Sequence, residues 1–288
     1  MTARLGLILL LALVSISSTS LVIRYVATVP ALVLAFWRMF IAGGMLWGFS
    51  AYRPQGKLSF KNKKRILFAG IFLGCHFACF FLGVRHTPIA NATLLGCMVP
   101  IFTVLISVFL KKKIEKLTYI GLTIALLGAG IVQADGFYLD NENLFGNSIS
   151  LLGALFIALT FILAGKIRED TGNIIYGRTL FFIAAATLLL IAIISGDSVF
   201  NFEMNHILWF LFLGLIPSIF GHNLLNYAVK YISPTAISSI PLGEPIIASL
   251  FALIIFGETI PHGALVGGPV ILLGVSLILK NQIASTIE

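Results

Sequence analysis

The stretch ALVLAFWRMFIAGGMLWGF, residues 31–49, contains a single charged residue, Arg38, in an otherwise apolar run. A second stretch, TAISSIPLGEPIIASLFALIIF at residues 235–256, also contains one charge, Glu244. Each run is about 20 residues long, the length of a helix that crosses the hydrocarbon core of a bilayer. A charge at that depth costs roughly 2.5–3.5 kcal/mol even on the mildest scale. We therefore expect both side chains to face a protein-lined or water-lined interior, and a transported molecule is the simplest reason for one.

The rest of the chain has the same apolar character. Of its 288 residues, 59% are hydrophobic and 10% are charged, and the mean hydropathy is +1.04. Runs long enough to span a membrane recur along the chain, and the connections between them are too short for a soluble domain. The expected spans are residues 5–23, 30–49, 66–84, 90–110, 117–134, 147–165, 175–195, 206–228, 235–256 and 263–280. The sequence therefore predicts an all-α polytopic membrane protein with ten transmembrane helices.

The placement of the basic residues predicts the orientation of the chain. The net charge is +8, but the lysines and arginines gather in alternate loops, which is the positive-inside pattern rather than a nucleic-acid-binding surface. If the N-terminus is cytoplasmic, only Arg24 and Arg85 fall outside, and only Arg38 falls within the membrane. We therefore expect a multi-pass protein of the cell inner membrane with both termini cytoplasmic.

The remaining composition bounds the partners. The first apolar segment runs on without a convincing cleavage site, so we interpret it as a retained helix rather than a signal peptide. Cys75, Cys79 and Cys97 lie inside expected spans and lack the spacing of metal ligands. We expect no metal, no cofactor and no nucleic acid. The expected partners are a small-molecule substrate and the lipid bilayer, and the chain is expected to be a monomer or a weak homodimer.

The second half of the sequence resembles the first at four places that keep the same order. The matches are Arg38 with Arg178, residues 84–90 with 230–236, Pro100 with Pro245, and the pair Gly121 and Gly128 with the pair Gly267 and Gly274. Chance matches among apolar helices are the alternative, but the shared order favours a duplication. Because each half has five spans, equivalent helices cross the bilayer in opposite senses. The prediction is two inverted five-helix repeats, residues 1–140 and 141–288.

Three short motifs accompany this ten-span plan: FWRMF at residues 36–40, PLGEP at 241–245 and FGE at 256–258. In combination they resemble the drug/metabolite transporter superfamily, and most closely its EamA-type members, whose repeat is a five-helix unit. The first half departs from that pattern, since its fourth span ends in Leu110 and three lysines, and Val99 stands at the place that matches Glu244. The resemblance implies ten helices around a central cavity, and transport of amino acids, nucleotide-related metabolites or drugs.

The two buried charges are the first candidates for a substrate site. Arginine is always charged, so Arg38 must pair or sit in water. An ion pair with Glu244 and a clamp on a substrate carboxylate both remain open. Pro241 and Pro245 flank Glu244, and backbone carbonyls freed by proline are tolerated at membrane depth where they are packed or line a cavity. A helix hinge is the alternative interpretation of these prolines.

Further polar residues within the spans complete the candidate set. Asn223, Asn226 and Tyr227 are spaced to share one helix face, which either a polar ligand or interhelical hydrogen bonds would satisfy. Trp37 could stack on a ligand or face lipid, and His76 could relay a proton or bond to a neighbouring helix. The candidate substrate-binding residues are Trp37, Arg38, His76, Asn91, Asn223, Asn226, Tyr227 and Glu244.

These features favour a carrier over other classes of protein. The sequence has no nucleophile elbow, phosphate loop or pair of intramembrane carboxylates, so we expect no enzyme activity. We predict a secondary transporter that moves an amino acid or a related zwitterionic or cationic compound by alternating access, with a proton as one candidate coupling ion. A drug or toxic-compound exporter of the same fold is the main alternative. A channel fits two pseudo-symmetric halves less well.

Overall fold

The computed structural model describes residues 3–53, 56–134, 141–256, 260 and 262–287, and their regular structure is helical. Nine stretches of these residues are long and apolar enough to cross a membrane. The remaining expected span, the ninth (residues 235–256), is formed by three shorter helices that together cover residues 234–256. The prediction of an all-α polytopic membrane protein is confirmed. Gly257 and Glu258 of the FGE motif lie outside the described residues.

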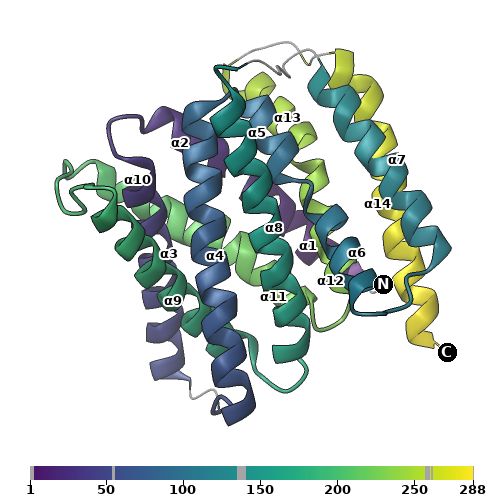
Figure 1. The fold of residues 1–288 in the computed structure, drawn as a ribbon, viewed down its shortest axis with the longest axis horizontal. Coiled ribbons are helices and arrows are strands. Elements are labelled where there is room, and N and C mark those ends of the chain that lie inside the picture. Colours follow the sequence, from purple (N-terminus) through teal and green to yellow (C-terminus); the bar gives the residue numbers. More distant parts are fainter. Residues whose placement is uncertain (1–2, 54–55, 135–140, 257–259, 261, 288) are drawn as a thin grey trace.

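The spans correspond to the following elements, which Figure 1 labels. In chain order they are α1 (Ala3–Ser17), α2 (Thr19–Tyr25), α3 (Ala31–Tyr52), α4 (Phe60–His86), α5 (Ile89–Gly96), α6 (Val99–Phe109), α7 (Lys116–Gln133), α8 (Leu144–Ile167), α9 (Asn173–Ile194), α10 (His206–Leu213), η2 (Gly214–Asn223), α11 (Leu224–Ala228), α12 (Pro234–Ser239), η3 (Ile240–Gly243), α13 (Glu244–Phe256) and α14 (His262–Ile287).

Proline sets the start of several helices. Pro30 directly precedes α3, and Pro88 directly precedes α5. Pro234 is the first residue of α12, where the hydroxyl of Ser233 accepts a hydrogen bond of 3.2 Å from the backbone N–H of Ala236. Proline suits such places because its fixed φ is helical and its missing N–H has no intrahelical role there. The matched segments 84–90 and 230–236 therefore both end one span and begin the next.

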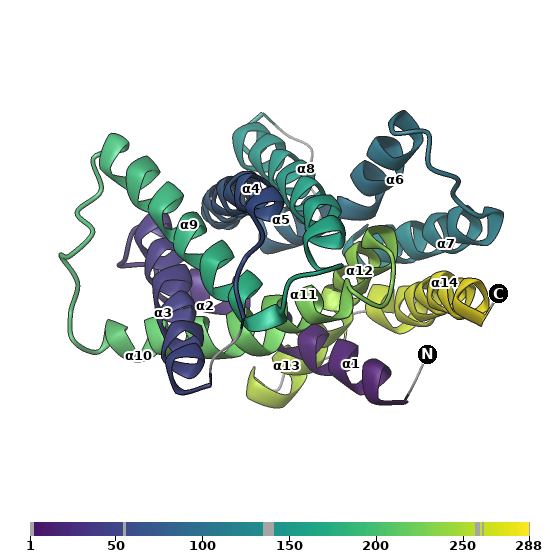
Figure 2. The same ribbon diagram turned by 90° about the horizontal axis from the view of Figure 1, so that it is seen from below.

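Helix packing follows the repeat. Helix α7 lies along α14, and α3 lies along α9, so each pairs with the element at the same place in the other half (Figures 1 and 2). Helix α4, the third span, packs on α8, the sixth. In the same way η2 and α11, of the eighth span, pack on α1, of the first span, so the third span of each half packs on the first span of the other. This reciprocal pattern is typical of a duplicated unit related by a two-fold axis. With five spans in each half, that axis relates helices of opposite direction.

Glycine allows the closest of these contacts. A Cβ atom built on Gly128 of α7 would lie 2.9 Å from the carbonyl oxygen of Gly267 on α14, and one built on Gly274 would lie 2.5 Å from that of Gly121. The two backbones therefore touch, as small residues permit between membrane helices. The two glycine pairs that match in the sequence thus pack against each other in space.

Four spans are interrupted within their length. The first breaks at Ser18 between α1 and α2, and the fourth breaks at residues 97–98 between α5 and α6. The eighth contains the π-helix η2, and the ninth contains the 3-10 helix η3. Irregular backbone at membrane depth is tolerated where it is packed in protein or lines a cavity, and π-segments often occur at functional sites. The breaks therefore indicate where a site should be sought.

Two arginines join helix ends at the end of the molecule where α4 leads into α5. Arg24, in the last turn of α2, donates hydrogen bonds to the carbonyl oxygens of Val84 (2.8 Å) and Thr87 (2.9 Å) at the end of α4. Arg85, in the last turn of α4, donates in return to the segment after α2. Its acceptors are the carbonyl oxygens of Val26 (2.6 Å), Ala27 (2.7 Å) and Val29 (3.0 Å). We call Arg24, Arg85 and these five carbonyl groups the arginine brace.

The opposite end has a smaller counterpart of the brace. Arg168 follows the last residue of α8, and its Nε donates a 3.0 Å hydrogen bond to the carbonyl oxygen of Asn226 in α11. Its Nη1 donates to the carbonyl oxygen of Thr171. Arg24 and Arg168 thus occupy corresponding places, at the ends of the first and sixth spans. Cations suit helix C-termini because the carbonyl groups there carry partial negative charge.

Candidate functional site

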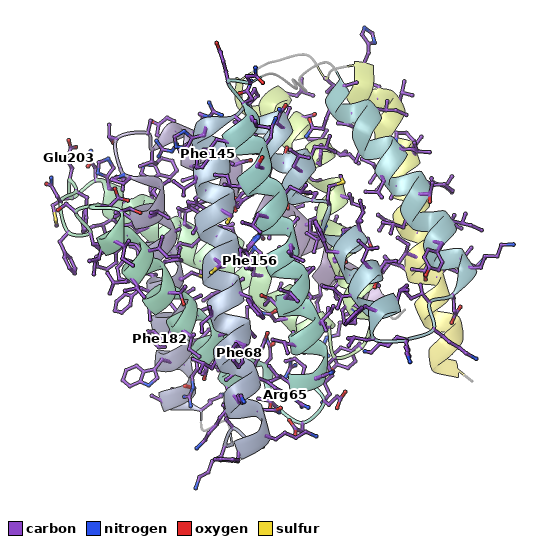
Figure 3. The ribbon with its side chains drawn as sticks, in the orientation of Figure 1. Arg65, Phe68, Phe145, Phe156, Phe182 and Glu203 are labelled. Atoms are coloured by element: carbon purple, nitrogen blue, oxygen red, sulfur yellow. The ribbon has the colours of Figure 1, made fainter. Side chains whose placement is uncertain are left out.

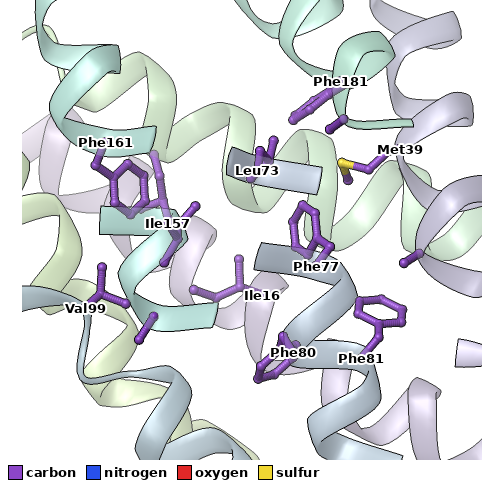
Figure 4. Packing of buried hydrophobic residues seen from close by; sticks show 14 of the residues in the cluster. Ile16, Met39, Leu73, Phe77, Phe80, Phe81, Val99, Ile157, Phe161 and Phe181 are labelled. Carbon is purple, nitrogen blue, oxygen red and sulfur yellow. The ribbon is translucent and has the colours of Figure 1, made fainter. Parts of the chain in front are cut away.

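A cavity lies in the middle of the helical body, where the interrupted spans meet. Its open volume is about 40 Å³, enough for a few water molecules. The lining residues come from seven spans: Ile16, Thr19, Arg38, His76, Phe77, Phe80, Gly96, Cys97, Val99, Ile157, Phe161, His222, Leu225, Pro241 and Glu244. Figure 4 shows the apolar part of this wall, with phenylalanines of α4 and α8 beside Ile16 and Val99. Thr19, Cys97, His222 and Pro241 lie at or beside the four helix breaks.

Arg38 is completely buried and is held by the π-helix. Its Nε donates a 2.8 Å hydrogen bond to Ser218 Oγ, and its Nη2 donates a 3.3 Å bond to the carbonyl oxygen of Pro217. The guanidinium carbon lies 4.4 Å from the ring centroid of Phe77, a cation–π distance. The third nitrogen, Nη1, has no hydrogen-bond partner. Arg38 is therefore fixed in place while one of its donor groups remains unused.

Glu244 reaches the same cavity from the second half of the chain. It is the first residue of α13 and directly follows the 3-10 turn that contains Pro241. In the part of the chain that the structure describes, no ion pair joins Glu244 to Arg38. Two opposite charges thus line one cavity without neutralising each other by direct contact. This leaves both available to a molecule that carries charges of both signs.

Two histidines complete the polar part of the cavity wall. His76 Nδ1 lies 2.9 Å from the carbonyl oxygen of Gly153 on α8. Because a carbonyl group only accepts, Nδ1 carries the hydrogen and the other ring nitrogen does not in the neutral ring. The His222 ring packs against Phe77 at 5.0 Å between centroids and lies 6.3 Å from the His76 ring. His222 was not among the predicted site residues, although Pro217, five residues before it, is a sequence signal for irregular backbone there.

Two of the predicted site residues, Asn91 and Trp37, link helices or loops outside the cavity. Asn91 Nδ2 donates a 2.8 Å hydrogen bond to Asn147 Oδ1, which links α5 to α8. Trp37 Nε1 donates a 3.1 Å bond to the carbonyl oxygen of Val199, and its ring stacks on Phe210. The structure does not place either residue among those that line the cavity.

The predicted face on the eighth span lies toward the Arg168 end of the molecule. Asn223 accepts hydrogen bonds of 3.1 Å from Asn173 at its backbone and side-chain oxygens. The backbone of Asn226 accepts from Arg168, and the Tyr227 hydroxyl accepts from that of Tyr231. The cavity lining as described includes Arg38, His76 and Glu244 but not these three residues. Of the eight predicted residues, Arg38, His76 and Glu244 therefore line the cavity. The three residues of the eighth span lie toward the Arg168 end, and Trp37 and Asn91 make their contacts elsewhere.

These observations describe a multi-pass helical membrane protein with a partly charged cavity between two repeated halves. The chain belongs to the EamA-like transporter family, whose model matches residues 4–133 and 144–280. It is accordingly a membrane transporter of the drug/metabolite superfamily rather than an enzyme.

Curated relatives agree with this assignment. The pseudopaline exporter CntI of Pseudomonas aeruginosa is 28% identical over 217 residues, 74% of this chain and 73% of that protein. The uncharacterized inner membrane transporter YedA of Escherichia coli K12 is 25% identical over 247 residues, which cover 84% of this chain and 80% of that transporter. An uncharacterized transporter of Clostridium kluyveri is 26% identical over 66% of this chain, and the match spans 63% of that relative. One crystal structure superposes with a TM-score of 0.80 over 100% of both chains at 17% identity, which shows the fold alone.

Proposed function

We propose that the protein is a secondary transporter for a small zwitterionic or cationic metabolite of the amino-acid type. The supporting observation is that Arg38 and Glu244, from opposite halves of the chain, line one cavity without a direct ion pair. A carboxylate complements the guanidinium group of Arg38, and an ammonium group complements the carboxylate of Glu244. A molecule with both groups satisfies both buried charges at once.

The size of the cavity supports alternating access. An open volume of about 40 Å³ is far below the roughly 300–1,000 Å³ of a typical ligand pocket. A metabolite can therefore enter only when the surrounding helices separate. We propose that the two halves, residues 1–140 and 141–288, move relative to each other and expose the cavity to one side at a time, as inverted repeats do in other transporters. Glu244 is the proposed carrier of a coupling proton.

The second candidate is export of an apolar drug or toxic compound. Phe77, Phe80 and Phe161 form much of the cavity wall, and aromatic rings would suit such a molecule. An apolar compound, however, would leave the unused nitrogen of Arg38 without a partner. The relative named as a pseudopaline exporter supports export as the direction of transport.

The proposed location is the cell inner membrane with both termini cytoplasmic. The basic loop that joins α3 to α4 and the C-terminal end of α14 lie at the same end of the molecule (Figure 1). Figure 3 shows Arg65 at that end and Glu203 toward the other. The excess of basic residues at the Arg65 end supports a cytoplasmic position for it.

The test is uptake into proteoliposomes of individual radiolabelled L-amino acids and of cationic amines. We expect saturable uptake with counterflow for at least one amino acid, and a loss of at least about tenfold in the Glu244→Gln variant. Gln keeps the size and most hydrogen bonds of Glu, so the variant should still insert and purify. Glu203→Gln, on an exposed loop residue, is the matched control and should transport normally. Unchanged saturable transport by Glu244→Gln would refute the role of Glu244, and a non-saturating ion current would indicate a channel instead.

A further inference from the structure

Two buried polar atoms without a hydrogen-bond partner belong to residues that line the same cavity. They are Nη1 of Arg38 and Oγ1 of Thr19. Arg38 is 0% exposed and Thr19 is 4% exposed, so bulk water does not compensate either atom. An unsatisfied buried polar group costs about 1–3 kcal/mol. Two such groups on one cavity can both bond to the molecule that occupies it.

The Thr19 hydroxyl differs from its neighbours in this respect. Ser15, Ser17 and Ser18 each donate to a backbone carbonyl of the preceding turn, at 2.7, 2.7 and 2.8 Å. This is the usual way for a hydroxyl group to be satisfied within a helix. Thr19 begins α2 directly after the break at Ser18, and its hydroxyl has no such bond. The break therefore leaves one hydroxyl group of the serine-rich segment unused at the cavity.

The two groups together define the chemistry of the missing partner. The guanidinium nitrogen can only donate, and a hydroxyl group can donate equally well. A carboxylate has two oxygen atoms in one plane, so it can accept from both donors at once, and the bond from the arginine is charge-assisted. We propose that Arg38 Nη1 and Thr19 Oγ1 form an oxyanion subsite that binds the carboxylate group of the transported molecule. This inference rests on the proposed function and assigns the carboxylate end of the substrate to the first half of the chain.

The subsite predicts which substrates are accepted. A compound with an ammonium group alone satisfies Glu244 but leaves both donors without a partner. A compound with a carboxylate alone satisfies the donors. The phenylalanine-rich wall of the cavity suggests three matched probes that share a phenyl ring. They are 3-phenylpropanoate with the carboxylate alone, phenethylamine with the amine alone, and L-phenylalanine with both.

The experiment measures the thermal stabilisation of the purified full chain by each probe over a range of concentrations. The variant Thr19→Val removes the hydroxyl group at nearly constant shape, and Thr19→Ser retains it as the matched control. We expect 3-phenylpropanoate to stabilise the wild type and Thr19→Ser. In Thr19→Val its apparent affinity should fall about tenfold, which corresponds to about 1.4 kcal/mol. The response to phenethylamine should not change. Thr19→Ala replaces Thr19→Val if the latter does not purify as a folded protein.

Two results would overturn the subsite. The first is an unchanged affinity of Thr19→Val for 3-phenylpropanoate. The second is that neither 3-phenylpropanoate nor L-phenylalanine stabilises the wild-type protein. Failure of the proposed function is distinguishable from both. If 3-phenylpropanoate binds through Thr19 while no amino acid is transported, the subsite stands and the transport proposal falls. If amino acids are transported with the same KM in Thr19→Val, the transport proposal stands and the subsite falls.

Discussion

At the scale of single residues, Arg38 and Glu244 show how an unpaired charge can be kept within a membrane protein. Arg38 is held by Ser218 and by the Pro217 carbonyl rather than by a carboxylate. Its hydrogen bonds therefore come from the π-helix, and removing Glu244 should not by itself release Arg38. This distinguishes the arrangement from a buried ion pair, in which loss of one partner strands the other.

A double-mutant cycle tests this distinction. Arg38→Met should lower the stability of the purified protein, because it leaves the buried Pro217 carbonyl oxygen without this donor, at about 1–3 kcal/mol. The Ser218 hydroxyl keeps its 2.7 Å bond to the carbonyl oxygen of Leu213. Glu244→Gln should have a smaller effect, because it breaks none of the hydrogen bonds that hold Arg38. The measurement is unfolding in detergent. A double mutant clearly more stable than Arg38→Met would mean that Glu244 serves mainly to neutralise Arg38.

The sequence predicts the charged residues of the cavity better than its neutral ones. A single charge in an apolar run can be recognised from the sequence alone, because burying it in the membrane has a high free-energy cost. Thr19 is not distinguishable in that way, since it lies among four serines of residues 15–20 and differs only in lacking an internal hydrogen bond. Asn91 and Asn223 were predicted to bind substrate as polar residues within the spans, yet each bonds to another asparagine. Which amide finds a partner on a neighbouring helix depends on packing that the sequence does not specify.

At the scale of elements, the contact between α7 and α14 depends on glycine. A Cβ atom on Gly128 would lie 2.7 Å from the backbone nitrogen of Ile271, whereas nothing lies within 4 Å of one on Gly130 in the same helix. Gly128→Ala should therefore force the two helices apart and lower the melting temperature. Gly130→Ala should be neutral or stabilising by up to about 1 kcal/mol, because alanine favours helix more than glycine does. Equal melting temperatures for the two variants would contradict the close contact of the backbones.

The sequence also indicated where helices break, but not in what form. Pro241 and Pro245 predicted irregular backbone in the ninth span, and the structure has a 3-10 helix there. Pro217 lies within the π-helix of the eighth span. The break at Ser18 has no proline or glycine beside it. Its sequence signal is the run of hydroxyl residues, which can bond to the backbone and loosen a helix. The form of each break follows from the elements packed against it.

At the scale of the whole molecule, the ten-span architecture and the repeat follow from hydropathy and from the order of the proline, glycine and arginine matches. The orientation in the membrane is still a prediction. In variants Lys63→Cys and Asn141→Cys, both at exposed positions, a membrane-impermeant maleimide applied to intact cells should label residue 141 and not residue 63. The unmodified chain, whose three cysteines lie within spans, measures the background. Labelling at residue 63 from outside would reverse the proposed topology.

The arginine brace has a consequence for the speed of the transport cycle. Any opening that separates α2 from α4 must break its five arginine–carbonyl hydrogen bonds, and bonds to charged groups are worth about 1.5–3 kcal/mol each. The corresponding separation of α8 from α11 at the other end breaks one arginine–carbonyl bond between the two elements, from Arg168 to Asn226, because the bond from Arg168 to Thr171 lies within a single segment. If the protein works by the proposed alternating access, we therefore expect the two half-cycles to have unequal activation enthalpies, and the slower one to set a steep temperature dependence of turnover. Arg24→Gln should flatten the Arrhenius plot of transport, whereas the same replacement at Arg168 should leave its slope nearly unchanged.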